Sequence, residues 1–337
     1  DKPVRTIADI AKLAGVSKST VSRALSNSSL ISEETRNRIQ TIAREHNYQV
    51  NQPARSLSMR RTNTLAFVTH GYYDDICVED LFLLEMLGAI TATLAEMKYD
   101  LLMVNVDPYE TGWVNNYHNT GKVDGFILMT SMRKQQHIKL LVEMSAPFIA
   151  WGAPQQGANY CTVTGDNLSG GRLAAAYLLG IGKRKIAFLG GPAGELEVML
   201  RYQGFENAIS DAGITLDPSR VMHGDFSSAG GAEMMRRLFD RNIEVDAVFA
   251  NSDLIAIGAM NEIRDHGLQV PDDISVVGYD DLSLAQYCYP PLTTIKQNIP
   301  ESGRLLVQNL IQYLETGIVT NVSVPVEVVV RASTKVN

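Results

Sequence analysis

The sequence predicts an all-helical head over residues 1–49 followed by a larger α/β body over residues 62–337. A chain of 337 residues is too long for one hydrophobic core of ordinary size, so more than one domain is expected. Within the head, apolar residues recur at helical spacing. From residue 64 onward, short apolar runs alternate with helical stretches, which is typical of buried parallel strands joined by helices.

Charge is divided unevenly between these two parts. Residues 1–61 contain 11 Lys and Arg against 5 Asp and Glu, a net charge of +6. Since the whole chain carries −7, the remaining residues carry −13. A basic head on an acidic body indicates a module that binds nucleic acid, joined to a part that does not.

The first helix of the head is expected to begin at Ile7, after a capping box. The Thr6 hydroxyl can accept a hydrogen bond from an amide of the first turn, and the Asp9 carboxylate can reach back to Thr6. Gly15 can adopt the positive φ that ends a helix.

Ser17 is expected to cap a second helix over residues 18–25, and Ser32 a third from Glu33 to about His46. Two short helices joined by a turn that contains Gly, and braced by a third, form a helix-turn-helix. An ordinary helical hairpin is the alternative. The outward face of the second helix carries hydroxyls and two cations, which suit phosphate and base contacts in a major groove and favour binding to double-stranded DNA.

The head resembles the DNA-binding domain of the lactose/galactose repressor (LacI/GalR) family. The resemblance lies in residues 6–11, 15–17, 20–25, Tyr48, Asn51 and 54–57. It implies that Lys18, Ser19 and Arg23 read bases. The full set of expected DNA contacts is Thr6, Ser17, Lys18, Ser19, Thr20, Ser22, Arg23, Asn27, Asn51, Ala54 and Leu57.

Residues 50–61 are expected to form a hinge helix and linker. The segment is too short to be a stable helix alone. The resemblance implies that it orders on the operator and inserts Leu57 into the minor groove as an apolar wedge. Val50 stands where the family usually has Pro, and Pro53 lies inside the segment, where a first helical turn tolerates it. The alternative for Leu57 is a linker residue that packs on the body.

The body is expected to contain parallel sheets covered by helices. Apolar runs predict strands at 64–69, 101–106, 125–129, 147–151, 186–190, 247–250, 275–279 and 326–331. Helical stretches fall at 80–98, 167–180, 199–212, 228–240, 253–266 and 300–316. Because α/β sheets bind ligands outside the carboxyl ends of their strands, two sheets that face each other would enclose a ligand between them.

The resemblance to the same family continues through the body, at residues 166–167, 182–188, 201, 204–205, 252–253, 258–259, 270–281 and 291–297. It implies a two-lobed fold like that of a type I periplasmic sugar-binding protein. One lobe would comprise residues 62–161 and 294–321, the other 163–292 and 323–337, with three crossing strands between them.

A sugar needs paired polar groups and a flat aromatic surface. The resemblance makes Arg201 and Asp280 polar anchors and Phe226 a stacking platform. The full set of expected effector contacts is His70, Phe82, Trp151, Arg201, Phe226, Ser252, Asp280 and Gln297. Asp280 as a turn cap, and Phe226 and Phe82 as core residues, are the alternatives.

Two further aspartates, Asp166 and Asp253, are expected to be structural caps instead of ligands. The sequence also departs from the family at Ala150-Trp151-Gly152, where family members often have an Asp. One hydroxyl ligand is thus replaced by an aromatic surface.

Neither catalysis nor a cofactor or metal is expected. The sequence has no G-x-S-x-G or H-E-x-x-H motif, and Gly182-Lys183 lacks the rest of a P-loop. Its three cysteines lie far apart in the sequence, and we expect them to be reduced, buried thiols. Without a run of eighteen apolar residues or an apolar leader, a cytoplasmic protein with no membrane partner is expected.

Together these observations predict a transcriptional regulator, a repressor whose operator affinity is controlled by a carbohydrate effector bound between two lobes. A homodimer on a near-palindromic operator is expected, because one recognition helix reads only a few base pairs. A dimer is preferred over a tetramer, since the chain stops at Asn337 without a leucine-rich tail. The alternatives are a regulator of the same fold that senses a purine or a phosphoprotein, and a cytoplasmic sugar-binding protein.

Overall fold

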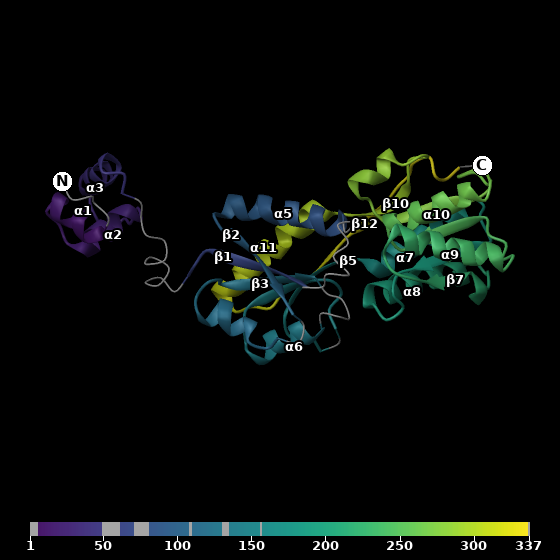
Figure 1. The fold of residues 1–337 in the computed structure, drawn as a ribbon, viewed down its shortest axis with the longest axis horizontal. Helices are drawn as coiled ribbons and strands as arrows, with labels where there is room; N and C mark the ends of the chain where they lie inside the picture. The colour runs from purple at the N-terminus through teal and green to yellow at the C-terminus, as the bar shows by residue number, and fades with distance from the viewer. Residues whose placement is uncertain are drawn as a thin grey trace. The chain divides into compact units, whose positions relative to one another are not determined.

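A computed structural model of the chain describes residues 6–48, 61–70, 81–107, 110–129, 135–155 and 157–335 (Figure 1). It divides into two compact units, Asp1–Asn63 and Thr64–Asn337. Most of the expected hinge, with Asn51, Ala54 and Leu57, lies outside the described residues.

The first unit is a bundle of three helices: α1 (Ile7–Ala14), α2 (Lys18–Leu25) and α3 (Glu33–Glu45). Ile10 of α1, Val21 of α2 and Ile39 of α3 have no exposed surface and meet in one small core. The helical spacing of apolar residues in the sequence therefore corresponds to the buried faces of these three helices.

The second unit contains two six-stranded sheets. The first has the strand order β11-β5-β4-β3-β1-β2 and the second β12-β10-β9-β8-β6-β7. Neighbouring strands are parallel, except that β10 and β12 are antiparallel. The strand bounds are β1 Thr64–His70, β2 Asp100–Val106, β3 Gly125–Met129, β4 Phe148–Trp151, β5 Cys161–Gly165, β6 Ile186–Gly190, β7 Val221–His223, β8 Ala247–Ala250, β9 Ser275–Asp280, β10 Thr293–Gln297, β11 Asn321–Val324 and β12 Val326–Val329.

Helices cover both faces of each sheet. On the first sheet, α5 (Leu81–Met97) and α11 (Ile299–Thr316) pack on one face and α6 (Gln135–Glu143) on the other (Figure 1). On the second, α7 (Asn167–Gly180) and α8 (Leu196–Asp211) pack on one face, and α9 (Ser228–Asp240) and α10 (Asp253–Asp265) on the other. None of the described helices is long and apolar enough to cross a membrane.

The chain crosses between the sheets three times, from β5 into α7, from β10 into α11 and from β11 into β12. All three crossings follow strands that the apolar runs did not predict. Four strands in total were missed, β5, β7, β10 and β11, and so was α6. The missed strands are short or alternate Thr, Ser and Asn with apolar residues, so they contain no continuous apolar run.

The bounds of two predicted elements were also wrong. The last strand ends at Val329 instead of residue 331, and α8 begins at Leu196 instead of residue 199. Both differences fall at element ends, where sequence patterns are least reliable.

Glycines at the contact between α7 and α8 allow the backbones of the two helices to pack directly against each other. A Cβ atom on Gly171 of α7 would lie 1.9 Å from the carbonyl oxygen of Arg201 in α8. A Cβ atom on Gly204 of α8 would lie 1.9 Å from the carbonyl oxygen of Leu168 in α7. Any side chain at these positions would force the helices apart, because protein interiors leave no space for an added atom.

Candidate functional site

The helix caps of the first unit form as the sequence predicts. The Thr6 Oγ1 atom accepts from the Asp9 amide at 3.2 Å, and the Asp9 carboxylate accepts from the Thr6 amide at 2.9 Å. α1 ends at Gly15 with φ 65°, and the Ser17 hydroxyl accepts from the Thr20 amide at 3.1 Å to begin α2. The turn between α1 and α2 is therefore fixed by local hydrogen bonds.

One face of α2 remains exposed. This face carries Lys18, Ser19, Ser22 and Arg23, while Val21 faces the core. The exposed face thus presents hydroxyl groups and two cations.

Thr6 and Ser17 are exposed, and Thr20 is half-buried. Asn27 follows α2 with a positive φ of 56°, and its side-chain oxygen accepts from Gln40 of α3 at 2.7 Å. This bond joins the end of α2 to α3.

In the second unit, three predicted effector residues, Ser252, Asp280 and Gln297, lie at or beside the carboxyl ends of β8, β9 and β10. Asp280 ends β9 and Gln297 ends β10, and the Gln297 amide donates to the Asp280 carboxylate at 2.8 Å. Asp280 has φ 114°, a conformation rare outside glycine. Such backbone strain persists only where surrounding structure holds it and is concentrated at functional sites.

Arg201 of α8 is 6% exposed, and its guanidinium is held from three sides. Its Nε atom donates to the Asn167 side chain at 2.8 Å. An Nη atom donates to the Asn251 carbonyl at 2.7 Å and to its side chain at 3.1 Å. The guanidinium carbon lies 3.7 Å from the centre of the Tyr279 ring, a cation–π contact.

Among the described residues, no carboxylate forms an ion pair with Arg201. A buried cation without a counter-charge is costly, so its position points to a ligand that completes its partners. Asn167, Asn251 and Tyr279 were not among the predicted site residues. All three lie within or beside the segments that carry the family resemblance, and adjacency to the predicted ligands was the signal available for them.

Phe226, the expected stacking platform, lies in the turn before α9 and its side chain remains 37% exposed. Its ring covers Gly191 at the end of β6, where an added Cβ atom would be 2.4 Å from the ring. That exposure argues against the core alternative for Phe226. Ser252 caps α10, and its hydroxyl accepts from the Ile255 amide at 3.2 Å.

In the first lobe, Trp151 ends β4 and its ring lies 5.8 Å from that of Phe82 in α5. Trp151 is 8% exposed and Phe82 is half-buried against the same hydrophobic core. Phe82 therefore packs on this core and is only partly buried there, so part of its surface remains accessible to a ligand. His70 ends β1, and its side chain lies outside the described residues.

The two aspartates expected to be structural caps differ in their partners, which are local for Asp166 and distant in sequence for Asp253. Asp166 caps α7, where its carboxylate accepts from the Ser169 amide at 3.0 Å, which confirms that expectation. Asp253 is fully buried and accepts from the Leu282 amide at 2.7 Å and the Thr294 hydroxyl at 2.6 Å. Burial, together with the nearby Asp280 carboxylate, raises the pKa of Asp253 well above its ordinary value.

Two carboxylates bridge the lobes directly. Glu197 of α8 accepts from the Ala153 amide, beyond β4, at 2.8 Å. Glu85 of α5 accepts from the Ser283 amide, beyond β9, at 2.8 Å. Each lobe therefore supplies one acceptor to the backbone of the other.

Comparisons with known proteins agree with this architecture. Residues 6–51 match the model of bacterial regulatory proteins of the lacI family, and residues 175–334 match that of a periplasmic binding protein-like domain. The chain is 33% identical over 311 residues to the HTH-type transcriptional regulator CelR of Thermobifida fusca, which covers 91% of each chain. It is 32% identical to the ribose operon repressor of Haemophilus influenzae, which covers 92% of each.

The chain belongs to the lacI family. Two solved structures extend the comparison. The lac repressor dimer bound to operator and the anti-inducer ONPF has a TM-score of 0.83 at 26% identity and covers 99% of each chain. The CelR–cellobiose complex has a TM-score of 0.75 at 30% identity and covers 97% of this chain and 99% of its own.

Membership of the lacI family confirms the predicted fold class, a helix-turn-helix head with a periplasmic-binding-protein-like α/β body. It also confirms that the protein is a DNA-binding transcriptional regulator. The relatives are regulators, not enzymes.

Proposed function

We propose that this lacI-family regulator is a repressor whose affinity for operator DNA is controlled by a carbohydrate bound between the two sheets of its body. The observation that carries the proposal is Arg201, a buried cation held in one orientation without a carboxylate partner among the described residues. A sugar hydroxyl would accept from this guanidinium.

The surrounding groups suit a sugar. The Asp280 carboxylate can accept from ligand hydroxyls, and the Gln297 amide that donates to it helps to hold its orientation. The half-exposed Phe226 ring offers the flat apolar surface that a pyranose face needs. Ser252 and Gln297 add hydrogen-bonding capacity, and His70, Phe82 and Trp151 are the proposed contributions of the first lobe.

Solved relatives support a carbohydrate as the effector class. Their descriptions name cellobiose for CelR, ONPG for the lac repressor, and ribose for a regulator from Enterococcus faecium. Other relatives are called purine repressors, PurR of Haemophilus influenzae among them. The aromatic pair of Phe82 and Trp151 would also stack on a flat purine, so a purine is the second candidate.

On the DNA side, we propose that α2 reads the operator in the major groove. The exposed hydroxyls and cations of α2 support this role, with Lys18, Ser19 and Arg23 as base contacts. Residues 50–61 would form the hinge that carries Leu57 into the minor groove.

We further propose a homodimer, in which α5 contributes to the interface. Leu84 of α5 is 55% exposed, and the small residues Gly88 and Thr91 follow it on the exposed side of the helix. An exposed apolar helix face beside small residues suits close contact with a second copy. The lac repressor relative is described as a dimer on its operator.

A ligand panel tests the effector class. Cellobiose, ribose, lactose, hypoxanthine and guanine are each added during thermal unfolding, and a ligand at 100 times its Kd adds about 2.7 kcal/mol to the unfolding free energy. We expect one sugar to raise the Tm of the wild type and to leave the Tm of the Arg201→Met variant unchanged. Stabilisation by a purine alone would replace the carbohydrate proposal with the second candidate.

A gel-shift titration against genomic fragments then tests the regulatory half. The stabilising ligand should change the Kd for the operator by about 5- to 150-fold, the usual range of allosteric coupling. Leu57→Ala should lower specific operator affinity and remove most of this dependence, while leaving effector affinity of the DNA-free protein unchanged. Full ligand control in that variant would show that the hinge is a passive linker.

A further inference from the structure

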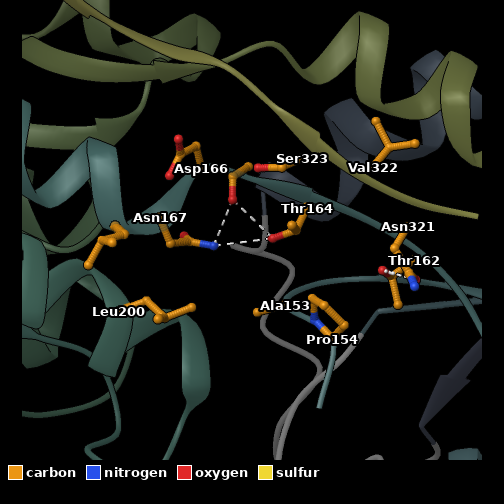
Figure 2. Close-up of a pocket in the computed structure, with 12 residues that line it drawn as sticks. Ala153, Pro154, Thr162, Thr164, Asp166, Asn167, Leu200, Asn321, Val322 and Ser323 are labelled. Carbon is orange, nitrogen blue, oxygen red and sulfur yellow. Dashed lines mark hydrogen bonds between the residues drawn. The ribbon is translucent and has the colours of Figure 1, made fainter. Parts of the chain in front are cut away.

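A second pocket lies beside the crossing strands, at the edge of the first sheet where β11 is outermost (Figure 2). Its volume is about 270 Å³, and none of the eight predicted effector residues lines it. The first lobe contributes residues of β5 and β11, with Ala153 and Pro154 after β4. The second lobe contributes the start of α7 and Leu200 of α8. Any occupant would touch both lobes at once.

The lining defines the chemistry of that occupant. Within the described residues, the lining contains no Lys or Arg, so it offers nothing to balance a phosphate or carboxylate. Its polar side chains are hydroxyls, amides and the carboxylate of Asp166. Three of the hydroxyl and amide side chains are buried: Thr162 at 1%, Asn167 at 3% and Thr164 at 9% exposure. A hydroxyl oxygen can accept two hydrogen bonds, so Thr162, which bonds the Asn321 side chain at 2.8 Å, keeps capacity for a ligand.

Apolar carbon forms the remaining wall. Leu200 faces the hydroxyl-bearing strands from the second lobe, as Figure 2 shows, and Val322 lies on β11. Hydroxyls on one side and aliphatic carbon on the other match a neutral polyhydroxylated molecule, whose C–H groups and hydroxyls lie on different faces. The volume is below the usual 300–1,000 Å³ of ligand sites, which limits the occupant to about the size of a monosaccharide.

Asn167 connects this pocket to the effector site. Its amide nitrogen donates to the Thr164 hydroxyl at 3.2 Å and to the Gly165 carbonyl at 3.0 Å, both on the crossing strand (Figure 2). Its oxygen accepts from Arg201 Nε at 2.8 Å. One side chain thus contacts the pocket wall and the proposed effector anchor.

Gly165 provides a second connection. A Cβ atom there would lie 2.3 Å from Gln297 Oε1, so the backbone of the crossing strand contacts a second proposed effector residue directly. A ligand that displaced Gly165 would therefore also displace the side chains of Asn167 and Gln297.

We propose that this pocket is a second small-molecule site, for a neutral polyhydroxylated molecule of monosaccharide size or smaller, and that Asn167 transmits its occupancy to Arg201. The transmission rests on the proposed role of Arg201, whereas binding in the pocket does not. Coupling between two sites is reciprocal, so the effector would change affinity for the second ligand by the same factor.

Saturation-transfer NMR with D-xylose and erythritol tests the binding. We expect signal from at least one probe with the full-length wild type, and equal signal with Arg201→Met, which removes the proposed effector anchor. Leu200→Trp fills the pocket and should abolish the signal, and the milder Thr162→Val should reduce it at least threefold if the tryptophan variant does not fold. Absence of signal from both probes, or undiminished signal in a folded Leu200→Trp protein, would overturn the proposal.

A readout independent of any effector tests the transmission. The Nε–H resonance of Arg201, assigned by its loss in Arg201→Met, should shift when the binding probe is added to the wild type. Because Asn167→Leu also changes the pocket wall, probe is added to that variant until its saturation-transfer signal equals that of the wild type, and the resonance should then stay unmoved. A resonance that does not respond in the wild type, despite probe binding, would remove Asn167 as the transmitter. If no sugar in the panel stabilises the wild type while the probe does shift this resonance, the effector assignment is wrong and the proposal for the second pocket stands.

Discussion

The contact between α7 and α8 makes Gly171→Ala a sensitive test of how Arg201 is positioned. The added methyl carbon would lie 1.9 Å from the Arg201 carbonyl oxygen, whereas unstrained contacts lie near about 3.5 Å. α8 must therefore move away by more than about 1 Å, and overpacking of this kind costs about 1–3 kcal/mol of unfolding free energy. The moving segment carries Arg201, so its bonds to Asn167 and Asn251 lengthen as well.

The same shift should weaken effector binding. Losing one hydrogen bond from a charged donor costs about 1.5–3 kcal/mol. That corresponds to at least a tenfold rise in effector Kd, measured by calorimetric titration beside urea unfolding.

Two other glycines supply matched controls. Gly180 lies in the same helix with nothing within 4 Å of an added Cβ, so Gly180→Ala should raise stability by about 0.5–1 kcal/mol and leave effector Kd unchanged. Gly303 of α11 lies in the other lobe, where an added Cβ would be 2.5 Å from Ala89. Gly303→Ala should destabilise the protein without weakening effector binding. Equal loss of effector affinity in Gly303→Ala and Gly171→Ala would refute the positioning argument.

Three further predictions concern single side chains. Arg23→Ala should weaken specific operator binding by about 1–3 kcal/mol and relax base preference, while competitor-DNA titrations show a smaller loss in non-specific binding; equal losses would make Arg23 a phosphate contact. Asp280→Ala should abolish the effector response in gel shifts and preserve operator binding, because it leaves ligand hydroxyls unpaired; an unchanged ligand titration would remove Asp280 from the site. Asp253 keeps its proton in the folded protein at pH values where the unfolded chain releases it, so the unfolding free energy should fall as pH rises above about 3.9, and Asp253→Asn should flatten that fall in urea titrations.

Patterns that repeat along the chain predicted most of the fold. The head was predictable because its caps, its Gly turn and its apolar spacing all agree, and the structure contains each of them. Central strands such as β3 and β9 are buried on both faces, so their sequences are continuously apolar. By contrast, β5 presents Thr162 and Thr164 to a pocket, and β11 is an edge strand, so neither has an apolar signature.

The site was only partly predictable for a similar reason. Arg201 and Asp280 could be named from resemblance, but the partners that orient Arg201 come from three separate elements that meet only in the fold. An asparagine is also compatible with a turn or a helix cap, so its sequence context does not reveal a buried hydrogen-bonding role. Such contacts require the three-dimensional arrangement.

The carboxylate bridges between the lobes limit which substitutions this chain can tolerate at the two positions that they contact. Glu85 and Glu197 each accept from a main-chain amide, so the side chains at positions 283 and 153 do not enter the contact. Ser283 is exposed, so almost any residue can stand there, whereas the buried Ala153 leaves room only for a small side chain. Proline, which has no amide hydrogen, would break the bridge at either position. Substitutions at position 283 would therefore leave lobe geometry intact, and a proline introduced at position 153 or 283 would alter the closure of the body while every ligand-contacting side chain stayed in place.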